Sequence, residues 1–182
     1  MARKGLDYVA FAKYAYSSGT TTYSQGVKLS TAAGFNVNVN SNVVNDYGDN
    51  RVVESSSEVT GGDVSVELNN DDAVLYGFLI GATVTENQGK VTIVSNANDE
   101  PPLVGAAAIG KTGNVYRLKV YKKCRFSEPN DENATKQENI AFTHTTVSGR
   151  MIIPEDGEWR IMEDYSTLAD AIAALEALFH IQ

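Results

Sequence analysis

The clearest match to a chemical motif lies in the middle of the chain. Residues 105–112 read GAAAIGKT and satisfy the nucleotide-binding pattern G-x-x-x-x-G-K-[ST]. Such a loop holds phosphates because its amides and its lysine surround them just before a helix begins. Here Gly113 and Asn114 follow, and then a segment that alternates as a strand does. No apolar strand ending in Asp follows to hold Mg²⁺. We therefore expect a hairpin turn over Lys111–Asn114 and no phosphate site.

The other reactive side chains form no recognisable catalytic or metal-binding pattern. His144 and His180 are the only histidines and Cys124 is the only cysteine, too few for a zinc site of the usual kind. The G-x-S-x-G sequence that carries the nucleophile of many serine hydrolases does not occur in the chain. Paired acids occur where turns and helix starts favour acids anyway. We assign no catalytic, cofactor-binding or metal-binding residue and expect no enzyme activity.

Composition narrows the class of protein. The 182 residues are predicted to form a single domain over 1–182, with 42% hydrophobic residues and a net charge of −8. No apolar run approaches the ~20 residues of a membrane helix, and no apolar region follows the basic N-terminus as in a signal peptide. We expect a protein assembled in the host cytoplasm. An acidic chain is poorly suited to grip phosphates; it suits a protein that is merely soluble, and equally one that must let DNA pass without holding it.

Alternating apolar and polar residues, separated by turn signals, predict a mainly β (α+β) fold of two packed antiparallel sheets. A weak hairpin is expected over Thr83–Ile93, a small apolar segment over Leu103–Ile109, and a turn region over Gly149–Gly157. The expected strands are Asp7–Tyr16, Tyr23–Leu29, Phe35–Val43, Asp63–Leu68, Asn114–Phe126, Glu138–Val147 and Glu158–Met162.

Two helices are expected beside the sheets. Ala73–Ile80 is a short apolar segment after a run of Asn and Asp that suits a helix start, and Gly81 suits its end. After Thr167, apolar residues recur at helical spacing to the end of the chain. Thr167 and Asp170 form the start of this C-terminal helix as a capping box.

Two strands carry unusual polar faces. Phe35–Val43 alternates apolar residues with asparagines, and Asp63–Leu68 alternates valines and leucine with Asp, Ser and Glu. Asparagine is a poor strand former, so a row of asparagines is unexpected. The face is either ordinary solvated surface or a surface that meets something polar without binding it tightly.

Two polar segments are long for loops of one domain. Asn45–Gly62 is an extended loop, or a hairpin arm if Arg51–Glu54 forms a strand, and Ser127–Gln137 is an exposed loop.

Several blocks, in order and over nearly the whole chain, resemble the major tail tube proteins of siphophages, the long-tailed, non-contractile bacteriophages, and one Gram-positive phage group in particular. The blocks are ARKGLDYVAFAKY (2–14), FNVNVNSNVVNDYGDNRVVE (35–54), VTGGDVSVEL (59–68), VGAAAIGK (104–111), YKKCRFSEPNDENATKQENIAF (121–142) and PEDGEWRIMEDYSTLADAIAAL (154–175).

The resemblance implies a structural virion protein that forms stacked, hexameric rings. The stacked rings make a hollow tube in the phage tail that conducts DNA into the host. It implies homo-oligomerisation, a tape-measure protein that sets length, tail terminator and distal tail proteins at the ends, and DNA that passes without specific binding. No cofactor is implied.

The resemblance also gives the polar segments roles. One sheet of each subunit lines the bore, and the lumen-facing candidates are Asn36, Asn38, Asn40, Asp63, Ser65 and Glu67. Loops or arms bridge subunits and rings, and the contact candidates are Asp46, Tyr47, Asp49, Arg51, Glu54, Glu128, Asn130, Asp131, Glu132 and Lys136. Arg117 and Lys119 fit a bore poorly unless acids on neighbouring strands pair with them.

Two alternatives stay open. A tube subunit of a contractile injection or secretion system would share the fold and the assembly. A β-sandwich binding module would suit the strands but would need an exposed aromatic platform.

Overall fold

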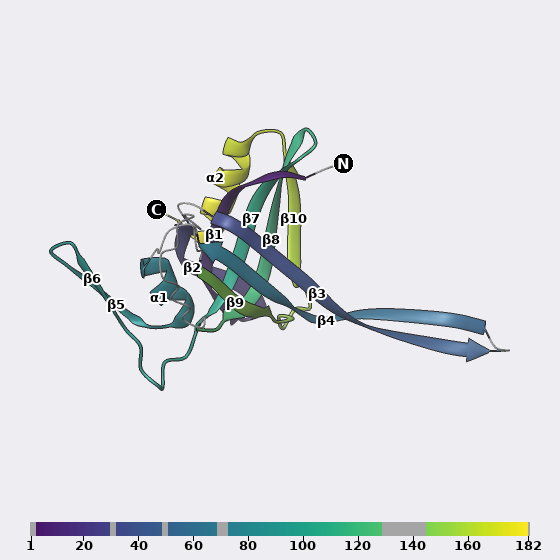
Figure 1. The fold of residues 1–182 in the computed structure, drawn as a ribbon. Coiled ribbons are helices and arrows are strands. Elements are labelled where there is room, and N and C mark those ends of the chain that lie inside the picture. Colours follow the sequence, from purple (N-terminus) through teal and green to yellow (C-terminus); the bar gives the residue numbers. More distant parts are fainter. Residues whose placement is uncertain (1–2, 30–31, 49–50, 69–72, 129–144, 182) are drawn as a thin grey trace, which may run out of the picture.

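The computed structural model describes residues 3–29, 32–48, 51–68, 73–128 and 145–181, and it confirms a mainly β, antiparallel fold with a middle and a C-terminal helix (Figure 1). The elements are β1 Arg3–Ser17, β2 Thr20–Leu29, β3 Ala32–Gly48, β4 Arg51–Leu68, α1 Ala73–Ile80, β5 Thr83–Asn87, β6 Lys90–Val94, β7 Leu103–Thr112, β8 Val115–Phe126, β9 Thr145–Met151, β10 Arg160–Tyr165 and α2 Leu168–Phe179.

Most strands belong to one sheet, ordered β2-β1-β7-β8-β9-β4-β3, while β5 and β6 form a separate two-stranded sheet. The large sheet branches at β8, which pairs with β10 over Tyr116–Tyr121 and with β9 over Cys124–Phe126. Its two ends curl toward each other, as Figure 1 shows, so that β3 and β4 lie across from β1 and β7. The two packed layers are therefore parts of one continuous sheet.

The main core fills the space inside this curl. It includes Phe11 of β1, Val66 of β4, Val104 of β7 and Phe126 of β8, all fully buried. Phe11 and Phe126 meet edge to face, with ring centroids 5.5 Å apart. Helix α1 closes one end of this core with Leu75 and Leu79.

A second core lies on the opposite side of β1, β7 and β8, where α2 covers the sheet. Leu175 and Phe179 of α2 are fully buried, and Phe179 packs on Tyr23 of β2 at 4.9 Å between ring centroids. Thr167 caps the helix by accepting a hydrogen bond from the Asp170 amide, as the capping box predicts. His180 takes the left-handed conformation that ends it.

The tight turns follow the sequence signals. Between β7 and β8, Gly113 and Asn114 form a two-residue turn in which Gly113 has φ of +63°, where glycine is favoured. The expected turn at Lys111–Asn114 is therefore confirmed, although Lys111 and Thr112 are still strand residues. Helix α1 has the predicted bounds, and Gly81 follows it with φ of +79°.

One boundary expectation was wrong. Gly149–Gly157 was expected to be a turn region from its glycines and proline, but Gly149–Met151 belongs to β9. A Cβ on Gly149 would lie 2.5 Å from the Arg125 carbonyl oxygen, so this glycine permits close approach of two strands and does not mark a turn. The expected strand at Glu158–Met162 is β10, which begins later, at Arg160. Residues 138–144 of the expected strand Glu138–Val147 lie outside the described residues.

The hairpin of β3 and β4 is far longer than either expected strand. Strand β4 pairs with β9 only over Gly62–Leu68, so the part of the hairpin beyond Gly61 is a ribbon of two strands. We call residues 40–48 and 51–61 the arm. Figure 1 shows the arm extending well away from the body of the molecule.

Candidate assembly surfaces

The string that resembles a phosphate-binding loop is a central strand. Residues 105–112 lie in β7, which pairs with β1 on one side and β8 on the other. Their backbone groups are therefore engaged in a sheet ladder, and a strand follows where a phosphate-binding loop needs a helix. The geometry of a nucleotide loop is absent from this part of the described chain.

The six lumen-facing candidates lie on one continuous surface. The register places Asn36 opposite Ser65, Asn38 opposite Asp63, and Gly34 opposite Glu67. Val64 and Val66, which alternate with the polar residues, are buried in the main core. The three asparagines and Asp63 are exposed, while Ser65 and Glu67 are half-buried. We call this surface the polar face.

Strand β9 and the end of β8 extend the polar face with residues that sequence reasoning missed. Thr146, Ser148 and Arg150 pair with Glu67, Ser65 and Asp63, and Arg150 also pairs with Arg125 of β8. Val147, Gly149 and Met151 alternate with these polar residues as in a strand, but Gly149 suggested a turn instead. The two acids and two arginines of the polar face balance, so the face is polar and close to neutral.

Only some of the contact candidates can be placed. Asp46 and Tyr47 lie on β3 and Arg51 and Glu54 on β4, so all four belong to the arm. Glu128 is exposed just after β8. Asp49, Asn130, Asp131, Glu132 and Lys136 lie outside the described residues, as does most of the expected loop Ser127–Gln137.

The pairing expected for Arg117 is present. Its guanidinium donates two hydrogen bonds of 2.7 Å to the carboxylate of Asp164, which lies opposite it on β10. These bonds raise the pKa of Arg117 and lower that of Asp164. Both side chains are substantially exposed, so the pair adds little to the free energy of unfolding.

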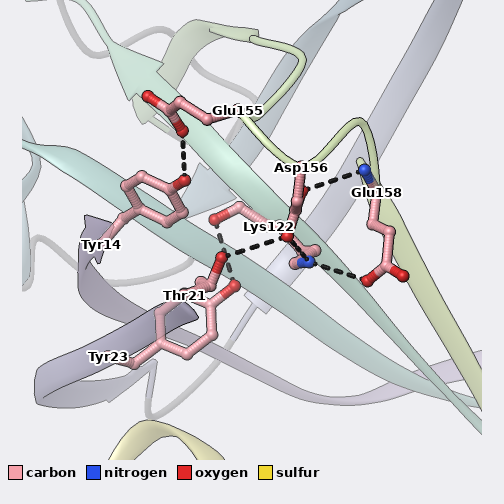
Figure 2. Close-up of polar contacts among 7 residues, drawn as sticks. All are labelled: Tyr14, Thr21, Tyr23, Lys122, Glu155, Asp156 and Glu158. Atoms are coloured by element: carbon pink, nitrogen blue, oxygen red, sulfur yellow. Dashed lines mark hydrogen bonds and ion pairs between the residues drawn. The ribbon is translucent and has the colours of Figure 1, made fainter. Parts of the chain in front are cut away.

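A network of ion pairs holds the turn before β10 against β8 (Figure 2). The ammonium of Lys122 lies 2.6 Å from Asp156 Oδ2 and 3.0 Å from Glu158 Oε2. Lys122 is only 5% exposed, and Asp156 also accepts a hydrogen bond from the Glu158 amide. Burial alone would lower the pKa of Lys122, but the bonds to the two carboxylates raise it overall.

Glu155 joins the same turn to two further strands. Its carboxylate accepts a hydrogen bond from Lys123 of β8. It also accepts one of 2.6 Å from the Tyr14 hydroxyl of β1 (Figure 2). The bonds from Lys123 and Tyr14 lower the pKa of Glu155 to about 2. Burial and the bond to Glu155 raise the pKa of Tyr14 to about 12. The arrangement ties β1 and β8 to the turn before β10, and no buried side-chain polar atom of the described residues is left without a partner.

A cavity of about 370 Å³ opens between β3 and the far ends of β7 and β8. We call it the mouth. Gly34–Val39 form one wall and Ala108–Thr112 the other, with Arg117, Lys119 and Arg160 at the rim of the sheet. None of the described residues that line the mouth is acidic. Its lining includes four basic residues, Lys111, Arg117, Lys119 and Arg160, of which Arg117 is paired with Asp164.

The single cysteine is buried, which makes its thiol unreactive. Cys124 is fully buried, and burial raises its pKa to about 12. Among the residues that the structure describes, no three His, Cys, Asp or Glu side chains are grouped as metal ligands. No helix in the described ranges has the length and apolar character to cross a membrane.

No protein-family model matches the sequence. No curated protein is significantly similar to it.

Proposed function

We propose that this chain is the major tail tube subunit of a siphophage, a structural protein that stacks as rings into a hollow conduit for DNA. The observation that carries the proposal is the arm, a long hairpin that leaves the body and has no third strand among the described residues. An isolated two-stranded ribbon is marginally stable in water. Such an arm is best explained by a neighbouring subunit that covers it.

Open strand edges support ring formation. Within the described chain, β2, β3 and β10 each pair along one side only. Exposed edges of this length invite pairing with another chain, which is a liability in a monomer but joins sheets in a ring. A ring of subunits joined edge to edge closes a barrel, and stacking of rings continues indefinitely.

The polar face supports a role as the wall of the bore. It is exposed or half-buried, spans four strands and balances two acids with two arginines. A wall without excess positive charge gives passing DNA nothing to bind through its phosphates. Asn36, Asn38 and Asn40 add polarity without charge.

Negative-stain electron microscopy of the purified chain, before and after concentration, tests this proposal. We expect hollow tubes or stacked rings. A variant in which residues 41–60 are replaced by a two-residue Asn-Gly turn should keep the circular dichroism of the body but form no tubes. A parent protein that stays monomeric at high concentration, with or without a seed of tail tips, would contradict the proposal.

A further inference from the structure

We propose that the side chains of Lys122 and Asp156 condense into an isopeptide bond, an amide that joins β8 to the turn before β10, with Glu158 relaying the protons. Such a bond would form within one subunit, whether or not that subunit assembles. It would give a covalent link between distant segments to a chain whose single cysteine permits no intrachain disulfide.

Lys122 is the only charged side chain that is buried in the described part of the chain, with 5% of its surface exposed. Its ammonium lies 2.6 Å from Asp156 Oδ2 and 3.0 Å from Glu158 Oε2 (Figure 2). Since Oδ2 is bonded to Cγ at ~1.2 Å, the nitrogen lies within ~3.9 Å of the carbon that it would attack. Atoms poised to react lie ~3–3.5 Å apart, so a small movement of the side chain is enough.

Hydrogen bonds hold the lysine and the two acids in place. The Lys122 amide donates to the Trp159 carbonyl at 3.0 Å, and the Lys122 carbonyl accepts from the buried Tyr23 hydroxyl at 3.2 Å. Asp156 Oδ1 accepts from the Glu158 amide at 3.0 Å. This last bond leaves Oδ2 toward the lysine and places an N–H where negative charge develops on Oδ1 during the attack.

The neighbouring ion pair provides an internal comparison. In the described chain Lys123 contacts a single carboxylate, that of Glu155, which also accepts a hydrogen bond from the Tyr14 hydroxyl. No second carboxylate touches this ammonium to remove its proton. We therefore expect a bond through Lys122 and none through Lys123, although both lysines meet acids of the same turn.

The site rests as an ion pair. Burial lowers the pKa of Lys122, but the hydrogen bonds to the two carboxylates raise it overall, and the bond from Lys122 lowers the pKa of Asp156. The reaction begins when Glu158 takes one ammonium proton and passes it to Asp156 Oδ2, which leaves a neutral amine beside a neutral acid. Because this neutral pair is a minor form, the bond should form slowly.

The step is a condensation that needs no oxidant and no second reactant. The amine lone pair forms the bond to Asp156 Cγ, and the carbonyl electrons move to Oδ1. Glu158 then carries a second proton from the nitrogen to the Oδ2 hydroxyl. As the carbonyl reforms, the bond from Cγ to Oδ2 breaks and Oδ2 leaves as water. The two protons lost by the ammonium are those gained by the water, and Glu158 is again a carboxylate.

Mass spectrometry of the full chain tests the proposal. Cell-free synthesis supplies the start of a time course, and samples are taken while the folded protein is incubated. We expect the intact mass to fall by the mass of one water. Trypsin cannot cleave after a modified Lys122, so digestion should give one branched peptide that joins residues 120–123 to residues 151–160. A link through Lys123 would instead join residues 123–125 to residues 151–160.

Two variants separate the chemistry from the fold. Lys122→Arg keeps a positive charge beside both acids but has no amine that can form the bond. It should keep the circular dichroism of the parent and its full mass throughout. Glu158→Gln should slow bond formation about a hundredfold or more, the effect usual for general acid–base catalysis. A rate unchanged by Glu158→Gln would overturn the role of Glu158 as the relay.

A folded parent whose mass never falls would overturn the isopeptide bond, as would a link through Lys123. Attack by the Gly157 nitrogen on the Asp156 side chain would also release one water, but residues 151–160 would then remain an unbranched peptide. Loss of water without the branched peptide would therefore also overturn the proposal.

Discussion

At Glu155 a single carboxylate joins β1, β8 and the turn before β10, through Tyr14 and Lys123. The sequence shows this turn only as an acidic cluster, Glu155, Asp156 and Glu158, of the kind that turns often carry. Its partners could not be foreseen because they come from strands more than thirty residues away. The acidic cluster is therefore part of an ordered set of hydrogen bonds between distant strands.

Substituting Glu155→Gln should make the protein less sensitive to acid. The folded pKa of about 2 lies below the ordinary 4.5, so the ionised carboxylate stabilises the fold above about pH 4.5 and loses this effect as pH falls toward 2. The parent should therefore lose more stability between pH 5 and pH 2 than the variant does. Urea unfolding followed by circular dichroism at several pH values measures the difference. Parallel pH profiles for the two proteins would contradict the role given to Glu155.

Single strands and helices can be predicted from the sequence, whereas the pairing between distant strands cannot. Alternation identified the polar face of β3 and β4, and the helical spacing after Thr167 identified α2, because each pattern is complete within one segment. Pairing between distant segments carries no such local signal. The branch of the sheet at β8 and the addition of Arg150 to the polar face depend on it, and both were missed.

The sequence left the arm open between a loop and a hairpin for a different reason. Asn45–Gly62 is rich in Ser, Gly and Asn, which are poor strand formers. In the structure, the backbone pairing of the hairpin continues through this segment, with bulges at Asn40–Ser41 and Asp46–Tyr47. Side-chain preference therefore left a loop and a hairpin arm both open, and the structure has the hairpin arm.

The docking of α2 onto the sheet should depend on one aromatic side chain. Phe179 is fully buried against Tyr23, whereas its neighbour Leu178 is 37% exposed. Phe179→Ala should lower the free energy of unfolding by roughly 3–5 kcal/mol, because it leaves a cavity in the second core. Leu178→Ala should cost less than about 1 kcal/mol. Chemical unfolding of both variants provides the comparison, and equal losses would mean that α2 does not anchor through Phe179.

For the whole molecule, the curled sheet separates two surfaces that assembly would use differently. The polar face lies on the outside of β3, β4 and β9, while α2 covers the far side of β1, β7 and β8. A subunit with this arrangement can present the polar face to a bore and α2 to the exterior of a tube. The two surfaces should then differ in their access to solutes only after assembly.

Cysteine labelling can measure that difference, because the buried Cys124 does not compete. In tubes, Asn38→Cys should react with N-ethylmaleimide but only slowly with a polymer-linked maleimide that is too bulky to enter the bore. Ala173→Cys, exposed on α2, should react with both reagents. In dispersed subunits the two positions should behave alike, since both are exposed there. If tubes admit the bulky reagent to Asn38→Cys as fast as to Ala173→Cys, the polar face lies on the outside and the asparagine row is ordinary solvated surface.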